Sequence, residues 1–236
     1  FQSLGGIAGA FSRVINSQIH IQKLKETVDI DYADFVHEYS FSKSLKEHDV
    51  EINSVNFKYR NSPEWIFDNL NLKIKKNSHT VITGQNGSGK STLLGLISGM
   101  LIHQNGSIKI GRDKLGYIGP TPLILSTSLK ENLLYGNTAV VESKILETCE
   151  MFKLFDVVNK EILDRQVTNT SLSSGQMQKV GFIRAILSNV EILLLDESTS
   201  NLDRNTKSLI LDILTNKNIT VINSTHDPTS FKQIDR

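Results

Sequence analysis

The amino-acid sequence predicts an α/β fold in which a mostly parallel β-sheet is flanked by helices. Three observations predict this fold. From His79 onward, short β-branched runs alternate with stretches of helical periodicity, as in strand–helix–strand units. A glycine-rich loop, residues 84–89, stands between one such run and a predicted helix. A buried-strand run, Ile192–Leu195, ends in two carboxylates, and open parallel sheets place their binding residues at that end.

The first half of the folded region is predicted to be rich in strands. Flanking turn residues and apolar alternation predict a strand at about Glu51–Tyr59 and another near Leu70–Ile74, with a turn around Asn61–Pro63. The run His79–Thr83 predicts a strand that leads into the glycine-rich loop, and Lys90–Gly99 predicts the helix after it. Two more short strands are expected near Ser107–Ile110 and Gly116–Ile118.

The second half alternates helices with buried strands. Helical periodicity from about Ser128 to Leu163 predicts a separate lobe of helices. A helix, a strand, a helix and a strand then follow, at Ser174–Leu187, Glu191–Leu195, Asp203–Thr215 and Thr220–Ser224. Because strand and helix alternate, we expect a parallel sheet on one lobe and helices on the other.

The composition excludes several classes of protein. The chain has 236 residues, of which 39% are hydrophobic and 22% charged, as in an ordinary soluble globular protein. Lys and Arg number 26 against 25 Asp and Glu, so the charge gives no argument for binding nucleic acid or an anionic membrane surface. Cys149 is the only cysteine, which excludes an internal disulfide and a cysteine-based zinc cluster. Apolar neighbours at helical spacing predict that its thiol packs in a core.

The N-terminal part divides into two predicted segments. Residues 1–25 carry apolar side chains at intervals of three or four, which predicts an amphipathic helix. No run approaches the roughly 18 apolar residues that cross a bilayer, and no secretory signal is present, so we expect a cytosolic domain. Residues 26–49 are charged and irregular and predict a linker. The compact domain is expected to span residues 50–236.

A phosphate-binding loop is the clearest motif in the chain. It matches G-x-x-x-x-G-K-[ST] in full, with the residues Gly84, Gln85, Asn86, Gly87, Ser88, Gly89, Lys90, Ser91 and Thr92. The glycines let backbone N–H groups converge on phosphate oxygens, and the following helix adds the positive end of its dipole. Lys90 can then reach the β- and γ-phosphates, and the Ser91 hydroxyl can bind Mg²⁺. By itself the motif leaves kinases, GTPases and helicases open.

The carboxylate pair Asp196-Glu197 narrows the choice among these classes of nucleotide-binding protein. Asp196 ends a buried strand and is therefore expected beside the phosphate loop, where it can hold Mg²⁺ through water. Glu197 is placed to orient or deprotonate an attacking water. The sequence predicts a site for nucleotide and magnesium.

Further motifs resemble the ATP-binding cassette (ABC) family over roughly Val50 to Arg236. Leu172–Gln176 reads LSSGQ and resembles the family signature; Ser200–Asp203 resembles the D-loop, and Ser224–Asp227 contains His226 in the position of the switch histidine. The resemblance implies a P-loop NTPase core, an antiparallel β subdomain, and a helical subdomain of about residues 121–188 that carries the signature.

The resemblance also implies ATP and Mg²⁺ as cofactors, and two cassettes, identical or homologous, that bind head to tail. It casts Ser173, Ser174, Gly175, Gln176 and Asp203 as contacts to the ATP of the other subunit. Independently of the resemblance, Ser173–Gly175 is an N-cap sequence that opens a helix and forms an anion site.

Two more site residues follow from the resemblance. His226 resembles the residue that senses the γ-phosphate and joins Glu197 and Lys90 as a catalytic residue. Tyr59 resembles the aromatic residue that stacks on adenine.

Two segments are similar to exporters in particular. Tyr117–Leu123, running into Ser128–Leu133, is similar to the pattern that joins the Q-loop to the helical lobe, and residues 1–25 resemble the cytosolic end of a last transmembrane helix. This implies an ATPase coupled to transport, attached to transmembrane domains at the cytoplasmic face of the inner membrane, with no nucleic-acid partner.

The chain departs from the family pattern in four places. Pro120 stands where the family has the Q-loop glutamine, which ligates Mg²⁺ and couples the site to the membrane domain; Thr121 and Gln104 are candidate substitutes. Ser174 replaces a signature glycine, and Arg165–Asn169 lacks the Gly-Glu pair of exporters. The chain stops at Arg236, before the terminal strands and helix of the family, so the C-terminal end is expected to be truncated.

Two alternative functions stay open. Pro120 favours a regulatory cassette that binds ATP and hydrolyses it poorly. A soluble ATPase of DNA repair or translation is the other alternative, and it predicts a coiled-coil insertion or a tandem cassette; the sequence shows neither.

Overall fold

The computed structural model describes residues 38–42, 45–60, 62–135, 137, 139–199 and 202–225, and these residues belong to one compact unit. The predicted amphipathic helix of residues 1–25, His226 and the C-terminal end lie outside the described residues. Within the described part, no helix is both long and apolar enough to cross a bilayer.

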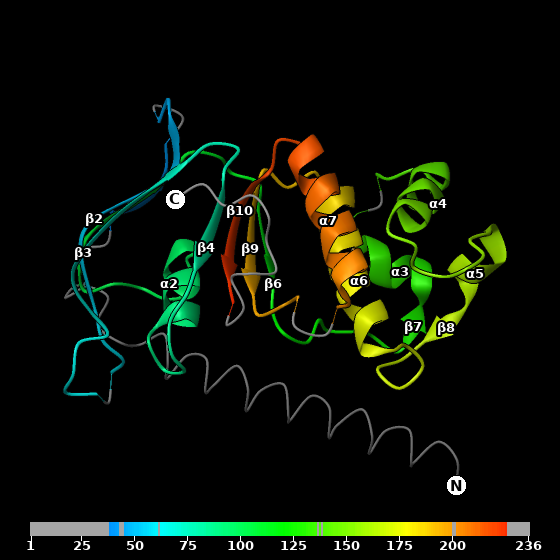
Figure 1. Cartoon of the computed structure of the whole chain (residues 1–236), viewed down its shortest axis with the longest axis horizontal. Helices are drawn as coiled ribbons and strands as arrows, with labels where there is room; N and C mark the ends of the chain where they lie inside the picture. Colours follow the sequence, from blue (N-terminus) through cyan, green and yellow to red (C-terminus); the bar gives the residue numbers. More distant parts are fainter. Residues whose placement is uncertain are drawn as a thin grey trace, which may run out of the picture. The chain divides into compact units, whose positions relative to one another are not determined.

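The first of two four-stranded sheets is mixed (Figure 1). Its strands, in the order β1-β5-β2-β3, are β1 (Glu38–Phe41), β5 (Asn105–Ile110), β2 (His48–Phe57) and β3 (Phe67–Lys75). β2 runs antiparallel to β3 and β5, and β1 runs parallel to β5. This sheet forms the predicted β subdomain.

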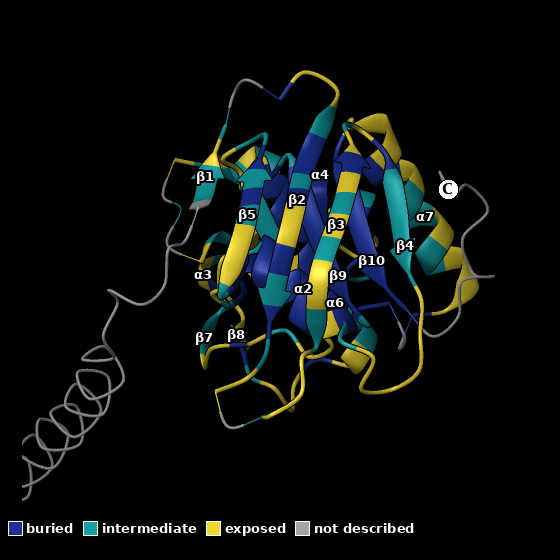
Figure 2. Ribbon diagram, turned by 90° about the vertical axis from the view of Figure 1, so that its left-hand side faces the viewer, coloured by how far each residue is buried: buried dark blue, intermediate teal, exposed yellow. Residues whose placement is uncertain are grey.

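The second sheet is parallel throughout and confirms the predicted fold class. Its strands, in the order β4-β10-β9-β6, are β4 (His79–Ile82), β10 (Thr220–Ser224), β9 (Ile192–Asp196) and β6 (Leu115–Ile118). β9 and β10 are buried along their whole length (Figure 2). Ile192 and Leu194 pack into one core, and Leu193 and Leu195 into another. A strand covered on both faces reads as a continuous apolar run, which explains the sequence of β9.

The helix α2 (Lys90–Ile97) lies between the two sheets, and its buried leucines join the core formed by β2, β5 and β9 (Figure 1). The helices α6 (Ser174–Leu187) and α7 (Arg204–Asn216) lie on the other side of the parallel sheet.

A helical lobe packs beyond α6. It consists of α3 (Leu129–Leu134), α4 (Glu142–Met151), α5 (Lys160–Asp164) and the short strand pair β7 (Thr127–Ser128) and β8 (Gln166–Val167). α3 and α4 contact α6, so the lobe is joined to the parallel sheet through the helix that carries LSSGQ.

Local sequence accounts for where the helices start. α3 begins with a capping box in which the Ser128 hydroxyl accepts from the Glu131 N–H while the Glu131 carboxylate accepts from the Ser128 N–H. Ser173 and Gln176 form the same arrangement at α6. The bounds of α6 coincide with the predicted ones, as do those of β10. The predicted helical stretch from Ser128 resolves into α3, α4 and α5.

The prediction differs from the structure at the start of the domain. β1 and the first residues of β2 lie inside residues 26–49, which the sequence assigns to a linker. The Tyr39 hydroxyl donates to the carbonyl of Ile97 at 2.9 Å, and Asp49 is fully buried. The sequence of this segment is polar and irregular, so it does not predict these contacts. The residues involved are distant in the chain and come together only when it folds. β7 and β8 are too short to show a period and are not predicted either.

Candidate functional site

The phosphate loop has the predicted place between β4 and α2, and residues 83–88 are exposed. Gly87 and Gly89 have φ angles of 81° and 90°, in the region that disfavours other residues. A Cβ atom on Gly89 would lie 2.9 Å from Ile66 Cγ2 and 3.1 Å from Phe67 Cζ. The loop therefore needs glycine at 89 for two separate reasons, backbone conformation and space.

The side chain of Lys90 points back toward the phosphate loop. It is buried, and its ammonium group donates to the carbonyl oxygens of Gly84 and Gln85, both at 3.0 Å. These bonds use two of the three ammonium donors. The positive charge thus lies inside the curve of the loop, where phosphate oxygens can replace the carbonyls.

Asp196, at the end of β9, receives three hydroxyl donors. Ser91 Oγ donates to Oδ1 at 3.0 Å and Ser224 Oγ donates to the same oxygen at 2.6 Å. The Tyr117 hydroxyl donates to Oδ2 at 2.9 Å. The structure therefore brings together the predicted pair Ser91 and Asp196, and it adds two residues that the sequence prediction missed.

The missed residues share one signal. Tyr117 and Ser224 lie at the carboxyl ends of β6 and β10, the two neighbours of β9 in the parallel sheet. Carboxyl ends of parallel strands meet at one edge, so the strand prediction could have pointed to both side chains. Burial raises the pKa of Tyr117, and its hydrogen bond to Asp196 and the charge of that carboxylate raise it further.

Glu197 continues directly from β9 with a φ of 50°, which is unusual for a residue with a side chain. Its backbone N–H donates to the carbonyl of Ser224 at 3.1 Å. The bond ties the chain to the end of β10 at the point where it turns away from the sheet. Sparsely populated backbone conformations of this kind are concentrated at functional sites.

The donor set fits a magnesium ion that also binds nucleotide. The Ser91 hydroxyl and the Asp196 carboxylate are hard oxygen ligands, which Mg²⁺ prefers together with phosphate oxygens and water. Among the described residues, no cluster of three or more His, Cys, Asp or Glu side chains could hold a metal by itself.

Tyr59 lies beside the start of α2. Its hydroxyl and Thr92 Oγ1 share a hydrogen bond of 2.9 Å, and its ring meets Phe57 edge to face at 5.2 Å. The residue is 46% exposed, so part of its surface remains accessible. This position suits the predicted contact with adenine.

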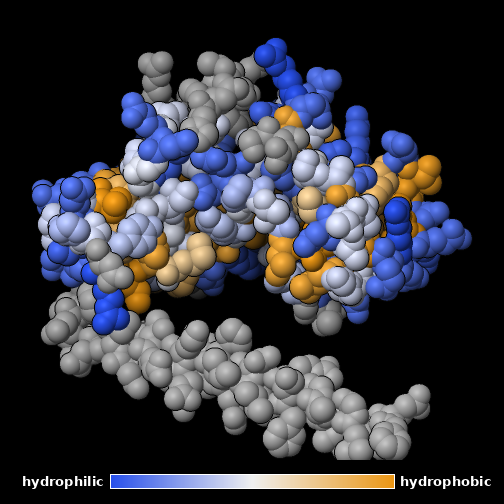
Figure 3. Space-filling model, turned by 90° about the horizontal axis from the view of Figure 1, so that it is seen from below, coloured by the Kyte–Doolittle hydropathy of each residue, from blue (hydrophilic) through white to orange (hydrophobic). Residues whose placement is uncertain are grey.

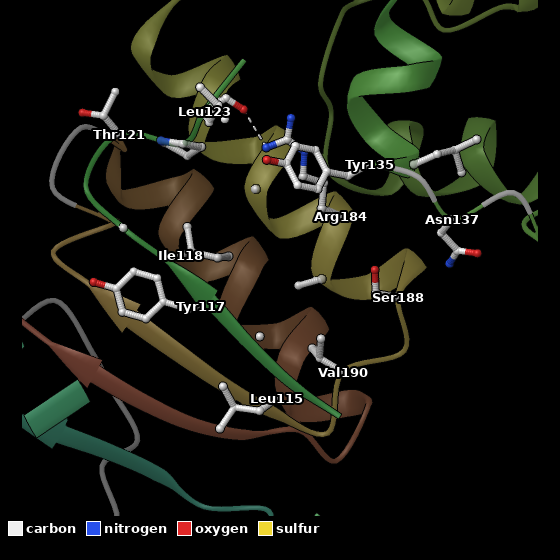
Figure 4. Close-up of a pocket in the computed structure, with 16 residues that line it drawn as sticks. Leu115, Tyr117, Ile118, Thr121, Leu123, Tyr135, Asn137, Arg184, Ser188 and Val190 are labelled. Carbon is white, nitrogen blue, oxygen red and sulfur yellow. Dashed lines mark hydrogen bonds between the residues drawn. The ribbon is translucent and has the colours of Figure 1, made fainter. Parts of the chain in front are cut away.

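The two candidate substitutes for the missing glutamine do not reach Asp196. Gln104 accepts from the Lys58 N–H at 3.1 Å and donates to the Lys58 carbonyl at 2.9 Å, so both ends of its amide are occupied. Thr121 lies in the wall of a groove beside β6 (Figure 4). Pro120 contributes its carbonyl, which accepts from the Gln178 side chain of α6 at 3.4 Å.

The signature residues and Asp203 lie at helix starts. Ser173 caps α6, and Ser173 and Ser174 are exposed. Asp203 caps α7 and accepts from the N–H and the hydroxyl of Thr206 at 2.9 and 2.6 Å, and these bonds lower the pKa of its carboxyl group. In the described part of the chain, no hydrogen bond joins these residues to the phosphate loop of the same molecule.

A groove of about 540 Å³ lies between β6 and the helical lobe (Figure 4). Exposed apolar side chains line it, among them Leu123 and Tyr135. Arg184 of α6 fixes its wall, since its guanidinium donates to the Leu123 carbonyl at 2.7 Å and lies 4.7 Å from the ring centre of Tyr135.

Relatives of the chain are transport proteins. The ABC transporter B family member 21 of Arabidopsis thaliana is 35% identical over 183 residues, which cover 70% of this chain and 14% of that protein. The ATP-dependent permease MDL1 of Candida albicans is 32% identical over 210 residues, covering 80% of this chain and 31% of that protein. The chain thus spans less than a third of the length of either relative.

A solved structure shows the same fold. A bacterial Atm1-family ABC exporter with ATP bound superposes with a TM-score of 0.75 at 22% identity, over 94% of this chain and 42% of that chain. Together with the phosphate loop, this confirms the predicted P-loop NTPase core. Residues 67–200, more than half of the chain, match the family model described as ABC transporter. The protein belongs to the ABC transporter family.

Proposed function

We propose that this chain is an ATP-binding and ATP-hydrolysing domain that dimerises head to tail around Mg-ATP and powers export by attached transmembrane domains. The observation that carries the proposal is the 3.0 Å hydrogen bond between Ser91 and Asp196. It joins the phosphate loop to the end of β9, two elements that a nucleotide-hydrolysing site needs at one place.

The chemistry follows from these groups. The exposed loop offers backbone N–H groups to the β- and γ-phosphates, and Lys90 exchanges the carbonyls of Gly84 and Gln85 for phosphate oxygens. Ser91 and Asp196 hold Mg²⁺, which when bound neutralises charge on the phosphates. Glu197 orients the attacking water, and the proposal assigns the sensing of the γ-phosphate to His226.

The exposed start of α6 supports the head-to-tail dimer. Its capping box occupies the N–H groups of Ser173 and Gln176, while those of Ser174 and Gly175 have no acceptor within the helix. Such N–H groups bind anions. With Asp203 at the start of α7, they provide the contacts to ATP held by a second copy or a homologous cassette.

The face of the described residues seen from below is not uniformly apolar. Viewed from below, the described face shows hydrophobic patches separated by hydrophilic side chains (Figure 3). Interfaces that form and separate are typically mixed in this way, whereas permanent ones are more apolar.

The groove beside β6 is the proposed contact for the transmembrane domains. It is apolar and open, and its lining includes Gly119 and residues 121–123, from the segment that leads from the magnesium site to the helical lobe. With such partners the chain lies at the cytoplasmic face of the inner membrane. The relatives named above, an ABC transporter and an ATP-dependent permease, support a role in transport. The proposal includes no nucleic-acid partner.

The dimer is tested with Glu197→Gln, which keeps the site's shape and removes the group that activates water. Mg-ATP should convert this variant from monomer to dimer in light scattering, whereas Lys90→Ala should stay monomeric. A monomer under every Mg-ATP condition would contradict the proposal.

A second function, a regulatory cassette with poor hydrolysis, is favoured by Pro120, whose side chain can neither ligate Mg²⁺ nor donate a hydrogen bond. Steady-state ATPase assays separate the two. A substantial wild-type rate that falls to background in Glu197→Gln removes the regulatory alternative, and equal background rates favour it.

A further inference from the structure

The hydroxyl of Tyr117 lies on the carboxylate that the proposed site uses for magnesium. It donates to Asp196 Oδ2 at 2.9 Å, while Oδ1 receives Ser91 and Ser224. Within the described residues, Tyr117 is the one side chain that donates to Oδ2. Asp196 is only 6% exposed, so loss of that donor would leave a buried carboxylate oxygen with one partner fewer.

The sheet determines which way Tyr117 points. β6 pairs in parallel with β9, with Tyr117 opposite Leu194 and Ile118 opposite Leu195. Ile118 and Leu195 pack into the core toward α6, so Tyr117 points to the other face of the sheet. Figure 4 shows the Tyr117 ring on the side of β6 away from Arg184 and Tyr135. This is the face on which α2 presents Ser91.

The three donors have different tasks. Ser91 is itself a proposed magnesium ligand, so its contact with Asp196 changes when the ion binds. Ser224 holds Oδ1 from β10. Without Tyr117, Oδ2 would lose its donor and the carboxylate could rotate about its terminal bond, which has a broad preference. The Tyr117 hydroxyl therefore helps to fix the rotation of the Asp196 carboxylate plane relative to the phosphate loop.

Residues 119–121 do not supply this function in another way. Gly119 has no side chain and the ring of Pro120 has no donor. Among the described side chains, the donors to Asp196 are Ser91, Tyr117 and Ser224, and Thr121 is not one of them. Gln104 is bound to Lys58. We infer that Tyr117 is a positioning residue that orients Asp196 for Mg²⁺, in a site whose neighbouring loop has proline instead of a polar side chain. This inference rests on the proposed function.

The test is Tyr117→Phe in the full chain, which removes only the hydroxyl. Partners that orient metal ligands typically change metal affinity, so the Mg²⁺ concentration for half-maximal Mg-ATP binding should rise by about 10- to 100-fold. Binding of ATP in EDTA should not change, because the phosphate loop is intact. The ATPase kcat at saturating Mg²⁺ should fall less than the Mg²⁺ affinity.

The matched control is Tyr39→Phe, which removes another phenol hydrogen bond, to the Ile97 carbonyl, away from the site. It should keep the wild-type Mg²⁺ dependence. Tyr117→Leu provides a second variant without a hydroxyl, should Tyr117→Phe fold poorly.

Three results are decisive. A wild-type Mg²⁺ dependence in both Tyr117 variants overturns the inference and leaves the proposed function intact. Equal weakening of ATP binding with and without Mg²⁺ also overturns it, since that indicates general damage. Failure of the wild-type chain to bind Mg-ATP overturns the proposed function first.

Discussion

Arg112 donates from Nε to the Asp49 carboxylate at 2.9 Å, and Asp49 is fully buried where the mixed sheet meets the parallel one. The other carboxylate oxygen accepts from the Thr220 hydroxyl of β10. Arg112 also donates to the Asn77 side chain at 2.6 Å, and the Asn77 N–H donates to Thr220 at 2.7 Å. One buried charge thus connects β2, the β3–β4 turn, the β5–β6 connection and β10.

Replacing Asp49 should destabilise the fold strongly. Asp49→Ala leaves the Arg112 Nε–H and the Thr220 hydroxyl without the carboxylate that accepts from them. Breaking a buried pair costs about 3–5 kcal/mol of unfolding free energy. Denaturant unfolding measures the loss. Glu147→Ala is the control, because its ion pair with Lys144 is exposed and should contribute nothing measurable. Equal stability of the two variants would contradict the prediction.

Gly89→Ala and Gly87→Ala separate backbone strain from steric contact. Both residues have positive φ, so alanine should cost about 1–2 kcal/mol at either position. Only at residue 89 does a Cβ atom meet neighbours, Ile66 and Phe67, while at residue 87 nothing lies within 4 Å. Gly89→Ala should therefore lose more stability and more ATP affinity. Thermal unfolding and a fluorescent ATP analogue provide the two measurements, and equal losses would show that the contact is unimportant.

Lys90→Ala should weaken ATP binding by roughly 10- to 100-fold, because hydrogen bonds to charged groups contribute about 1.5–3 kcal/mol. Isothermal titration of the full chain with Mg-ATP tests this. The exposed Lys73 of β3 provides the control, and Lys73→Ala should bind like the wild type. A loss in both variants would point to overall charge instead of the loop.

Cys149 predicts a specific pH dependence. It is fully buried, as its helical spacing predicts, and burial raises the pKa of its thiol from 9.0 to about 12. Between these values the unfolded chain loses the proton while the folded chain keeps it, so the thiol lowers stability as pH rises through this range. The slope reaches about 1.4 kcal/mol per pH unit.

Denaturant unfolding at pH values on either side of 9.0 measures this effect. The stability of Cys149→Ala should decrease less with rising pH than that of the wild type. The variant should be less stable overall, because the smaller side chain leaves a cavity. Identical slopes in the wild type and the variant would show that the thiol titrates alike in both states.

Features that depend on near neighbours in the chain are predictable from the sequence. The phosphate loop, α6 and β10 have the predicted places. Loop glycines, a capping box and a continuous apolar run respectively indicate them, and each of these patterns lies within a few consecutive residues. The pair Ser91 and Asp196 is predictable as well, since parallel strands end at one edge.

Only the tertiary structure decides which distant side chains complete the site. Tyr117 and Ser224 reach Asp196 from 79 and 28 residues away, and Asp49 and Arg112 are 63 residues apart. The sequence around a single hydroxyl or carboxylate group contains no periodic pattern that indicates which distant group it will contact. The environment of such a group is set by strand order and register, and these form only when the two cores on either side of β9 pack.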